Sequence, residues 1–473
     1  MLYPPELLAR TRNHSLIKPA GAVKGRARSG RGRMLSYQDF LAHLDGLGLF
    51  HMDLSLSRMA AFVERVGLPR FPVLHVVGTN GKGSTATILA ELLRAHGLRV
   101  GLYTSPHFVC VRERVLVDGA MLSEDAWARL GAAALSRSEG LGLTYFELLT
   151  ALAVLAFADA GVDVAVMEAG LGGRFDATNV LAPALTVFTP ISLDHMDVLG
   201  GTLAEIAADK AGAMRPGGLA LSARQEPEAW DVLERAARET GAELVSVSEV
   251  LSYSRAKGRV TPGPAGKASL QPMTGLYLRL RGLHQQDNAR TALAAFALWA
   301  ARMRLPMFEQ ACGEAFARVF IPGRMQFVPA GPGYPELILD GGHNTHGLAA
   351  LAASLDAGAI RPAAVVFGCL RDKPVAEMAA LVRGLAVDST GGPVFAVGIP
   401  SCSRACAPEE LTALLGPGAI PAADVHAALA ALKDSAGPVL VCGSLYLLGE
   451  FYMTHPGLLE QPEQPAAPLE ALP

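Results

Sequence analysis

The segment at residues 73–84 limits the possible folds of this chain more than any other. A compact apolar run, VLHVV at 73–77, predicts a buried strand, and the turn GTNGKGS follows it at 78–84. An apolar helical run then covers 85–96, and a further strand is expected at 99–103. Strand, loop, helix and strand in this order indicate a parallel sheet with helices packed on it.

The turn itself predicts a phosphate-binding loop. Its glycines let backbone N–H groups turn inward around phosphate oxygens, and the N-terminus of the following helix favours negative charge. Lys82 can reach the terminal phosphates, and Ser84 is the expected magnesium ligand. The loop departs from G-x-x-x-x-G-K-[ST] because Val76 replaces the first glycine and Gly83 directly follows the lysine. A Gly-rich turn without a ligand is the alternative.

The α/β pattern continues along the chain. Strands are expected at 163–167 and 185–189, with an apolar helix at 148–158 before them. Segment 222–283 is less periodic and is interpreted as a peripheral elaboration, and an apolar helix follows at 291–303. None of these segments approaches the ~20 apolar residues of a membrane span.

A second, smaller domain is expected after a break at IPGR, residues 321–324. Strands and helices alternate again, with strands expected at 336–339, 363–367, 393–397 and 439–442 and helices at 348–355, 409–415 and 424–432. The predicted organisation is a basic disordered tail at 1–33, an ATP-binding domain at 34–320, a Rossmann-like α/β domain at 325–456 and a loose tail at 457–473.

The charge distribution and the cysteine content limit the binding partners and the cellular compartment expected for this chain. Residues 1–33 carry eight Lys and Arg and one acidic residue, whereas residues 34–473 carry 33 basic and 43 acidic residues. The near-neutral total charge of the chain therefore hides the negative net charge of residues 34–473. An acidic body argues against a nucleic-acid or membrane-surface binder. The tail is interpreted as disordered, with translation from Met34 or a nucleic-acid-binding arm as alternatives. The six scattered cysteines form no CxxC pair, which favours a reducing cytosol.

Three further residues are candidates for the chemistry. Glu168 ends one predicted strand and His195 follows another, so both fall at the strand ends where open α/β sheets bind ligands. A carboxylate suits magnesium, and an imidazole is an unusual ligand for it. A satisfied loop histidine is the alternative for His195. Lys210 lies in a helix expected to start near Thr202, and its residue type alone favours a solvated helix lysine.

An ordered set of motifs resembles a known family. The resemblance covers about residues 34–455, and its motifs are GTNGKGST, YTSPH, RERV, EAGLGGRFDATN, LDH, DKAG, HQQDNA, PGRMQ and DGGHNTHG. This set is similar to the set in folylpolyglutamate synthases and dihydrofolate synthases of the Mur ligase superfamily. The resemblance implies a large P-loop-type ATPase domain with a mainly parallel sheet and a smaller C-terminal glutamate-ligase domain.

The resemblance also implies an activity. ATP would phosphorylate a pterin-linked carboxylate, and L-glutamate would attack the acyl phosphate to form an amide. Dihydropteroate, a reduced folate or both would be the acceptor, in a cytoplasmic monomer. A cell-wall ligase of the Mur type is the alternative, although only ~40 globular residues precede the phosphate loop, where such enzymes carry another domain. A GTPase-type switch would need an N-K-x-D motif, and none occurs.

The resemblance assigns roles to individual residues. Ser84 and Glu168 would hold one magnesium ion, and Glu168 with His195 would help to hold a second. Lys210 would be carbamylated and would then be a metal ligand as well. The residues expected to bind ATP are Gly78, Thr79, Asn80, Gly81, Lys82, Gly83, Ser84, Asn288, Arg324 and Asp340. The residues expected to act in catalysis are Lys82, Lys210, Asp340 and His343. The residues expected to bind the substrate are Ser105, Pro106, His107 and Arg112, with Arg114 in the same loop. A polar surface loop is the alternative for the last group.

Overall fold

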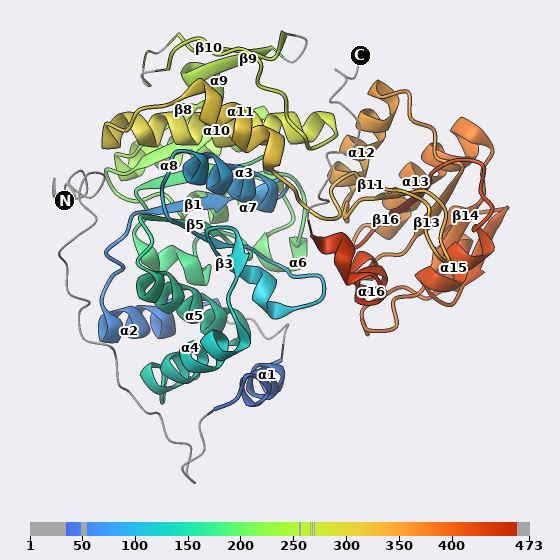
Figure 1. The fold of residues 1–473 in the computed structure, drawn as a ribbon, viewed down its shortest axis with the longest axis horizontal. Helices are drawn as coiled ribbons and strands as arrows, with labels where there is room; N and C mark the ends of the chain where they lie inside the picture. Colours follow the sequence, from blue (N-terminus) through green and yellow to red (C-terminus); the bar gives the residue numbers. More distant parts are fainter. Residues whose placement is uncertain are drawn as a thin grey trace.

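Two α/β lobes of unequal size lie side by side in the computed structural model of the chain (Figure 1). The structure describes residues 35–48, 54–254, 257–264, 266, 268 and 270–460. The basic tail predicted at 1–33 therefore lies outside the described residues, as does the predicted C-terminal tail beyond Glu460. Residues 456–459 form a short 3-10 turn that packs on the small lobe.

The large lobe is built on an eight-stranded sheet with the strand order β4-β3-β2-β5-β1-β6-β7-β8. Six strands, from β2 to β8 in that order, run parallel, and β3 and β4 add an antiparallel edge. The strands are β1 (Val73–Val77), β2 (Val100–Tyr103), β3 (Val115–Val117), β4 (Ala120–Met121), β5 (Val164–Glu168), β6 (Leu185–Phe188), β7 (Leu219–Ser222) and β8 (Glu243–Ser246).

Both faces of this sheet are covered, as its apolar parallel strands require. Leu74 and Val76 of β1 face one core, while Val73 and Val77 face the other side. The first face is covered by α3 (Lys82–Ala95), α10 (Leu283–Met303) and α11 (Glu309–Arg318). The second is covered by α1 (Tyr37–Gly46), α2 (Ser57–Val66), α4 (Glu124–Arg137), α5 (Tyr145–Ala160), α7 (Leu203–Ala211) and α8 (Pro227–Thr240).

Two short helices and a hairpin complete the large lobe. Helix α6 (Met196–Leu199) follows β6, and α9 (Val247–Val250) follows β8. The antiparallel pair β9 (Leu251–Ser254) and β10 (Arg259–Pro262) lies outside the main sheet.

The small lobe carries a six-stranded sheet with the order β11-β12-β16-β13-β14-β15, in which only β11 is antiparallel. Its strands are β11 (Gln326–Val328), β12 (Leu337–Leu339), β13 (Ala364–Phe367), β14 (Val394–Val397), β15 (Ala419–Ala422) and β16 (Val439–Cys442). One face is covered by α12 (Thr345–Ala357), α13 (Val375–Thr390) and α14 (Pro408–Leu415), and the other by α15 (Val425–Ala431) and α16 (Leu445–Thr454).

The structure corrects the interpretation of segment 222–283 as peripheral. Helix α8 and strand β8 extend the main sheet by one more parallel unit, and the β9–β10 hairpin lies outside that sheet. The buried face of α8 consists of Ala229, Leu233 and Ala237. Helix α8 is polar on average and β8 is a half-exposed edge strand, so the segment lacks the continuous apolar runs that mark the other elements of the sheet.

The packing of α5 against β2 leads to a stability prediction. The ring of Phe157 is fully buried between Phe71 and Gly101, and a Cβ atom at position 101 would come within 2.6 Å of it. Phe157→Ala removes this contact and leaves a cavity, so the free energy of unfolding of the large lobe should fall by about 3–5 kcal/mol in urea titrations. The control Met121→Ala alters a side chain that is 48% exposed in the same sheet and should change it by less than about 0.5 kcal/mol. Equal losses for the two variants would contradict this packing.

Candidate active site between the two lobes

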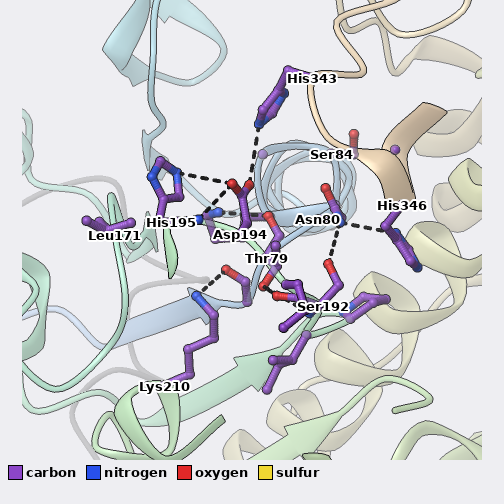
Figure 2. Close-up of a pocket in the computed structure, with 18 of the residues that line it drawn as sticks. Thr79, Asn80, Ser84, Leu171, Ser192, Asp194, His195, Lys210, His343 and His346 are labelled. Atoms are coloured by element: carbon purple, nitrogen blue, oxygen red, sulfur yellow. Dashed lines mark hydrogen bonds and ion pairs between the residues drawn. The ribbon is translucent and has the colours of Figure 1, made fainter. Parts of the chain in front are cut away.

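A cavity of about 2360 Å³ lies where the carboxyl ends of β1, β5 and β6 face the small lobe. Its large-lobe wall carries the phosphate loop, Glu168, His195 and Lys210, and its small-lobe wall carries Asp340 and His343. Residues from both lobes surround it in Figure 2. The structure therefore brings together the residues that the sequence placed in two separate domains.

The phosphate loop has the backbone that its glycines predict. Gly81 adopts a left-handed φ of 81° at the start of the 14-residue helix α3, and a Cβ atom there would collide with the Asn288 side chain. The N–H groups of Thr79 and Asn80 donate to the Pro190 carbonyl at 3.0 and 3.2 Å. The first turn of α3, which begins at Lys82, is thus the part of the loop suited to anion binding.

Lys82 and Glu168 lie on the two sides of this helix start. The Lys82 ammonium group donates to the Thr79 carbonyl at 3.1 Å. Glu168 is 3% exposed and accepts from the Ser105 N–H at 2.8 Å, and its carboxylate would lie 3.4 Å from a Cβ atom at Gly83. Burial raises the pKa of Glu168, while Lys82 opposes the shift. A cation bound beside Glu168 would stabilise its charged form.

Lys210 is not the solvated helix lysine that its residue type favoured. Helix α7 begins with a capping box of Thr202 and Glu205 and directs Lys210 inward, where it is 3% exposed. Its ammonium group donates to the Gly78 carbonyl at 3.0 Å, beneath the phosphate loop. Burial, together with the positive charge of Lys82, lowers the pKa of Lys210 to about 7. Near neutral pH the side chain is therefore partly a free amine, which is nucleophilic.

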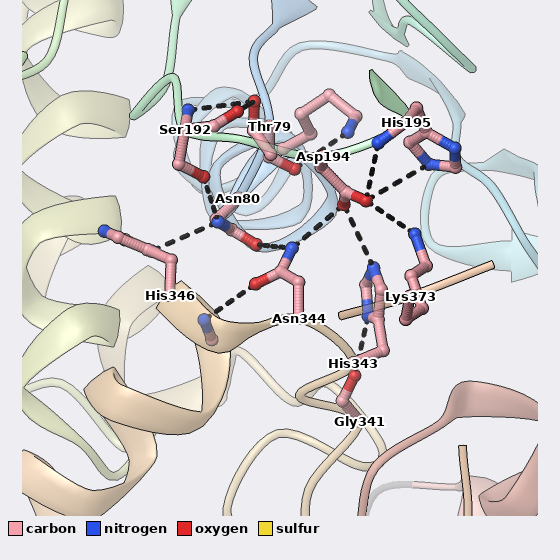
Figure 3. Close-up of polar contacts among 12 residues, drawn as sticks. Thr79, Asn80, Ser192, Asp194, His195, Gly341, His343, Asn344, His346 and Lys373 are labelled. Carbon is pink, nitrogen blue, oxygen red and sulfur yellow. Dashed lines mark hydrogen bonds and ion pairs between the residues drawn. The ribbon is translucent and has the colours of Figure 1, made fainter. Parts of the chain in front are cut away.

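The two lobes meet around the buried carboxylate of Asp194, whose side chain is only 4% exposed (Figure 3). From the small lobe, Lys373 donates to it at 2.6 Å and the Asn344 amide at 2.9 Å. Burial by itself would raise the pKa of Asp194, but Lys373, His195 and His343 lower it well below its usual range. This carboxylate therefore stays charged and links the lobes throughout the physiological range of pH.

Two histidines flank Asp194 from opposite lobes. His195 has a left-handed φ of 51°, and its Nε2 lies 3.9 Å from one Asp194 oxygen. His343 hydrogen-bonds the Gly341 carbonyl through Nδ1, and its Nε2 lies 3.9 Å from the other oxygen. Burial lowers the pKa of each ring to about 4, so both imidazoles are neutral at pH 7.

The other predicted nucleotide ligands lie near the junction of the lobes. Asn288 is buried in α10, where it donates to Gln285 at 3.1 Å and faces Gly81. Asp340 follows β12 and accepts from the N–H groups of Met325 and Gly342 at 2.9 and 2.8 Å. Arg324 and Asp340 both line the cavity.

The predicted substrate loop is only partly in the cavity wall. Ser105 and Pro106 line it, and so does Arg114. Arg112 lies outside the wall, donates to the Leu122 carbonyl at 3.2 Å and covers the Tyr37 ring. His107 also lies outside and accepts from Arg114 at 2.8 Å. The adjoining part of the wall is apolar and includes Leu54, Phe146, Leu171, Phe175 and Leu193.

The side chains of the cavity can hold a divalent metal ion only if phosphate oxygens and water supply the remaining ligands. Within the described part of the chain, no three His, Cys, Asp or Glu side chains gather closely enough to bind a metal. Magnesium in nucleotide sites takes one or two carboxylates and completes its shell with phosphate oxygens and water. The buried carboxylate of Glu168 lies close to Gly83, the residue before Ser84, and fits this kind of site.

Comparison with known proteins agrees with this arrangement. Residues 76–296 match the Mur ligase middle domain, and residues 323–445 match the Mur ligase glutamate ligase domain. The dihydrofolate synthase/folylpolyglutamate synthase of Bacillus subtilis is 34% identical over 72% of this chain and 82% of its own length. The dihydrofolate synthase/folylpolyglutamate synthase of Escherichia coli is 34% identical over 86% of this chain and 92% of its own length.

The chain belongs to the folylpolyglutamate synthase/dihydrofolate synthase family of Mur ligases. It is an ATP-dependent ligase, as the motif set predicted, and the cell-wall alternative has less support.

Solved structures give the same result for the fold. Escherichia coli FolC in complex with DHPP and ADP is 32% identical and has a TM-score of 0.79, with 92% of this chain and 99% of that chain covered. The Yersinia pestis bifunctional enzyme complexed with AMPPNP and Mn ion is 30% identical with a TM-score of 0.79 over 91% and 99% of the two chains. The fold class predicted from the sequence is confirmed. In the described part of this family member, no helix is long and apolar enough to cross a membrane.

Three residues of the site received no role from the sequence of this ligase. Asp194 stands in the LDH motif, Asn344 in the DGGHNTHG motif, and Lys373 lies outside every motif used. The first two could have been found from their neighbours His195 and His343. Lys373 gives no such signal, because its role depends on a partner 179 residues away.

The contact between lobes predicts the effect of neutralising Asp194. Asp194→Asn leaves Lys373 buried without a counter-charge, which should weaken lobe association by about 3–5 kcal/mol. The radius of gyration of the ligand-free ligase, measured by small-angle X-ray scattering, should therefore increase. Asp356→Asn is the control because it breaks an exposed ion pair with Arg361 and should leave the radius unchanged. An unchanged radius in Asp194→Asn would show that other contacts hold the lobes together.

Proposed function

We propose that this enzyme adds L-glutamate to dihydropteroate and to reduced folates through an acyl-phosphate intermediate. The observation that carries the proposal is the single cavity that joins a phosphate loop, a buried carboxylate and an apolar wall. These features supply in turn a place for ATP, a place for a metal ion and a place for a flat heterocycle. The enzyme would work as a monomer in the cytoplasm, with no nucleic-acid or membrane partner.

ATP would lie along the boundary between the lobes. Its phosphates would meet residues 78–84, and Asn288, Arg324 and Asp340 would contact the rest of the nucleotide. The support is that all of these residues line the same cavity and that Asn288 lies against Gly81. The Escherichia coli and Yersinia pestis structures described above are complexes with ADP and with AMPPNP, respectively.

Magnesium would be held at the start of α3. Ser84 and Glu168 would be ligands of one ion, and Glu168, His195 and Lys210 in carbamylated form would hold a second. When bound, the metal ions would neutralise charge on the phosphate oxygens. The neutral state of His195 suits a ligand role. The neutral amine of Lys210 suits reaction with carbon dioxide, which forms the N–C bond of a carbamate, releases a proton and leaves an anionic side chain.

The chemistry requires an activated carboxylate, because a free carboxylate is a poor acyl donor. Its oxygen would attack the γ-phosphorus of ATP, the bond to ADP would break, and an acyl phosphate would form. The amine of glutamate would then attack the acyl carbon, lose a proton and expel inorganic phosphate. Lys82 would stabilise the charge on the transferred group. His343 is neutral at pH 7 and close to Asp194, so it could accept the proton.

Closure of the lobes would protect the intermediate. An acyl phosphate hydrolyses if water reaches it, so the cavity must exclude bulk water during the reaction. The linker at 321–324 lies between the last helix of the large lobe and β11, and we propose it as the hinge. The contacts around Asp194 would hold the closed form.

The acceptor would lie along the apolar wall, with its pterin ring near Phe146, Leu171 and Phe175 and its carboxylate toward Lys82. Ser105 and Pro106 would border this site, and Arg114 supplies a positive charge there. His107 and Arg112 remain predicted substrate residues; their position behind the wall supports an indirect role, through Arg114 for His107 and through the loop backbone for Arg112.

A coupled assay of ADP release tests the proposed function. With ATP, magnesium and L-glutamate present, ADP should form with dihydropteroate and also with a reduced folate. Lys82→Met should lower both rates about 10²–10³-fold because it removes charge stabilisation of the transferred group. Lys257→Met, at an exposed position, is the matched control and should retain full rate. ADP formation with neither acceptor would overturn the proposal, and formation with only one would restrict it.

Carbamylation of Lys210 has its own test. The amine reacts only when neutral, so the carbamate should increase as pH rises through about 7, the pKa of Lys210 in the folded enzyme. Carbon-13 NMR of enzyme equilibrated with labelled bicarbonate should show a carbamate signal that follows this pH dependence and is lost in Lys210→Met. A signal that persists in Lys210→Met, or no signal at any pH, would contradict carbamylation at this position.

A further inference from the structure

Four of the six cysteines lie in the small lobe, and two of these are adjacent in space. Cys369, Cys402, Cys406 and Cys442 are all buried free thiols. The Sγ atoms of Cys369 and Cys406 are 3.9 Å apart, with the Cys369 thiol donating to the Cys406 sulfur. Neither residue belongs to the proposed catalytic machinery, so the pair has no explanation in the ligase reaction.

The backbone holds these two cysteines opposite each other. Leu370 and Ala405 form an isolated antiparallel bridge, and the N–H of Cys406 donates to the Cys369 carbonyl at 3.0 Å. On the other side of the bridge, the N–H of Arg371 donates to the Arg404 carbonyl at 2.9 Å. Residues that face each other across antiparallel segments have Cα atoms about 4.5–5.5 Å apart. This separation falls within the range of about 4.4–6.8 Å that disulfides need.

We propose that Cys369 and Cys406 are a dithiol site that a peroxide oxidises to a disulfide. A sulfur of the pair attacks one peroxide oxygen, the O–O bond breaks, and a sulfenic acid forms with loss of water. The second thiol attacks the sulfenic sulfur and displaces another water. Two thiols are oxidised by two electrons in total and one peroxide is reduced, so hydrogen peroxide gives one disulfide and two water molecules.

The two cysteines have different positions and therefore different roles. Cys406 is 5% exposed, whereas Cys369 is completely covered, so only Cys406 can be reached from solvent. The hydrogen bond from Cys369 lowers the pKa of Cys406. Burial and the nearby carboxylates of Glu410 and Asp372 oppose this shift and Arg371 supports it, and the net change is a decrease. Cys406 is thus the thiol that meets the peroxide, and Cys369 is the thiol that resolves the sulfenic acid.

The disulfide would act on the cavity through the two segments that the pair joins. Leu370, Lys373 and Arg404 line the cavity, and Lys373 reaches across to Asp194 from only four residues beyond Cys369. A bonded pair of sulfurs is about 2 Å closer than the present pair. The bond therefore tightens the segments that position Lys373 and slows the ligase. This consequence rests on the proposed function, whereas formation of the bond does not.

Peptide mapping tests bond formation without reference to activity. The full-length enzyme with Cys110→Ser, which removes the most exposed thiol, is treated with hydrogen peroxide and then alkylated and digested with trypsin without reduction. Cleavage after Arg404 separates Cys402 from Cys406, so a disulfide between 325–371 and 405–433 identifies the proposed pair. This species should appear, and it should disappear after dithiothreitol. Its absence, or a disulfide to Cys402 or Cys442 instead, would overturn the proposal.

The rate of ADP formation tests the consequence. Oxidised Cys110→Ser enzyme should be at least about fivefold slower than the reduced form and should recover in dithiothreitol, because small displacements of positioning groups cost rate. Adding Cys406→Ser should abolish both the linked peptide and the loss of rate, whereas adding Cys402→Ser should abolish neither. A linked enzyme with full rate would refute the effect on the cavity. If the reduced enzyme formed no ADP with either acceptor, the proposed function would fail while the mapping result still stood.

Discussion

The parallel pairing of β1 with β5 and β6 determines where this ligase can carry out chemistry. Val76 pairs with Glu168 on one side and with Val187 on the other, so the three strands end at one level. The phosphate loop, Glu168 and the segment that leads to His195 must therefore meet at the same edge of the sheet. Helix α7 adds Lys210 from below, through its hydrogen bond to Gly78. The composition of the large-lobe wall follows from strand register.

Burial gives the ionisable groups at this edge their distinctive properties. The carboxylate of Glu168 and the ammonium group of Lys210 are each 3% exposed, and burial shifts both pKa values toward the neutral forms. An added group of opposite charge would stabilise either residue, and such a group would lose little energy to solvent screening there. Asp194 is different, since Lys373 already compensates its charge. The site thus combines one completed ion pair with two groups whose charged forms depend on what binds.

Short-range sequence signals predicted the parts of the site that depend on local structure. The phosphate loop and Glu168 follow directly from strand ends and glycine positions. Residue type alone favours a solvated position for Lys210, because helical periodicity does not show that α7 packs beneath the phosphate loop. Only the motif resemblance placed Lys210 in the site. Lys373 could not be found, because its contact with Asp194 forms only when two lobes dock. Helix α8 has no such motif, and its sequence is polar on average, so a search for continuous apolar runs does not select it.

The proposed opening and closing of the lobes in each cycle limits how strong the Asp194–Lys373 contact can be. Both side chains are at most 5% exposed, so their attraction is offset by a large loss of hydration. A buried pair of this kind contributes little net stability compared with apolar packing, but breaking one partner is costly. A closed form in which the two side chains fail to pair would therefore be strongly destabilised, whereas the correctly paired closed form gains little free energy from the contact. An apolar interface of equal area would lack this property, because its attraction is not directional. The polar interface around Asp194 would therefore combine the proposed accurate closure with release of product.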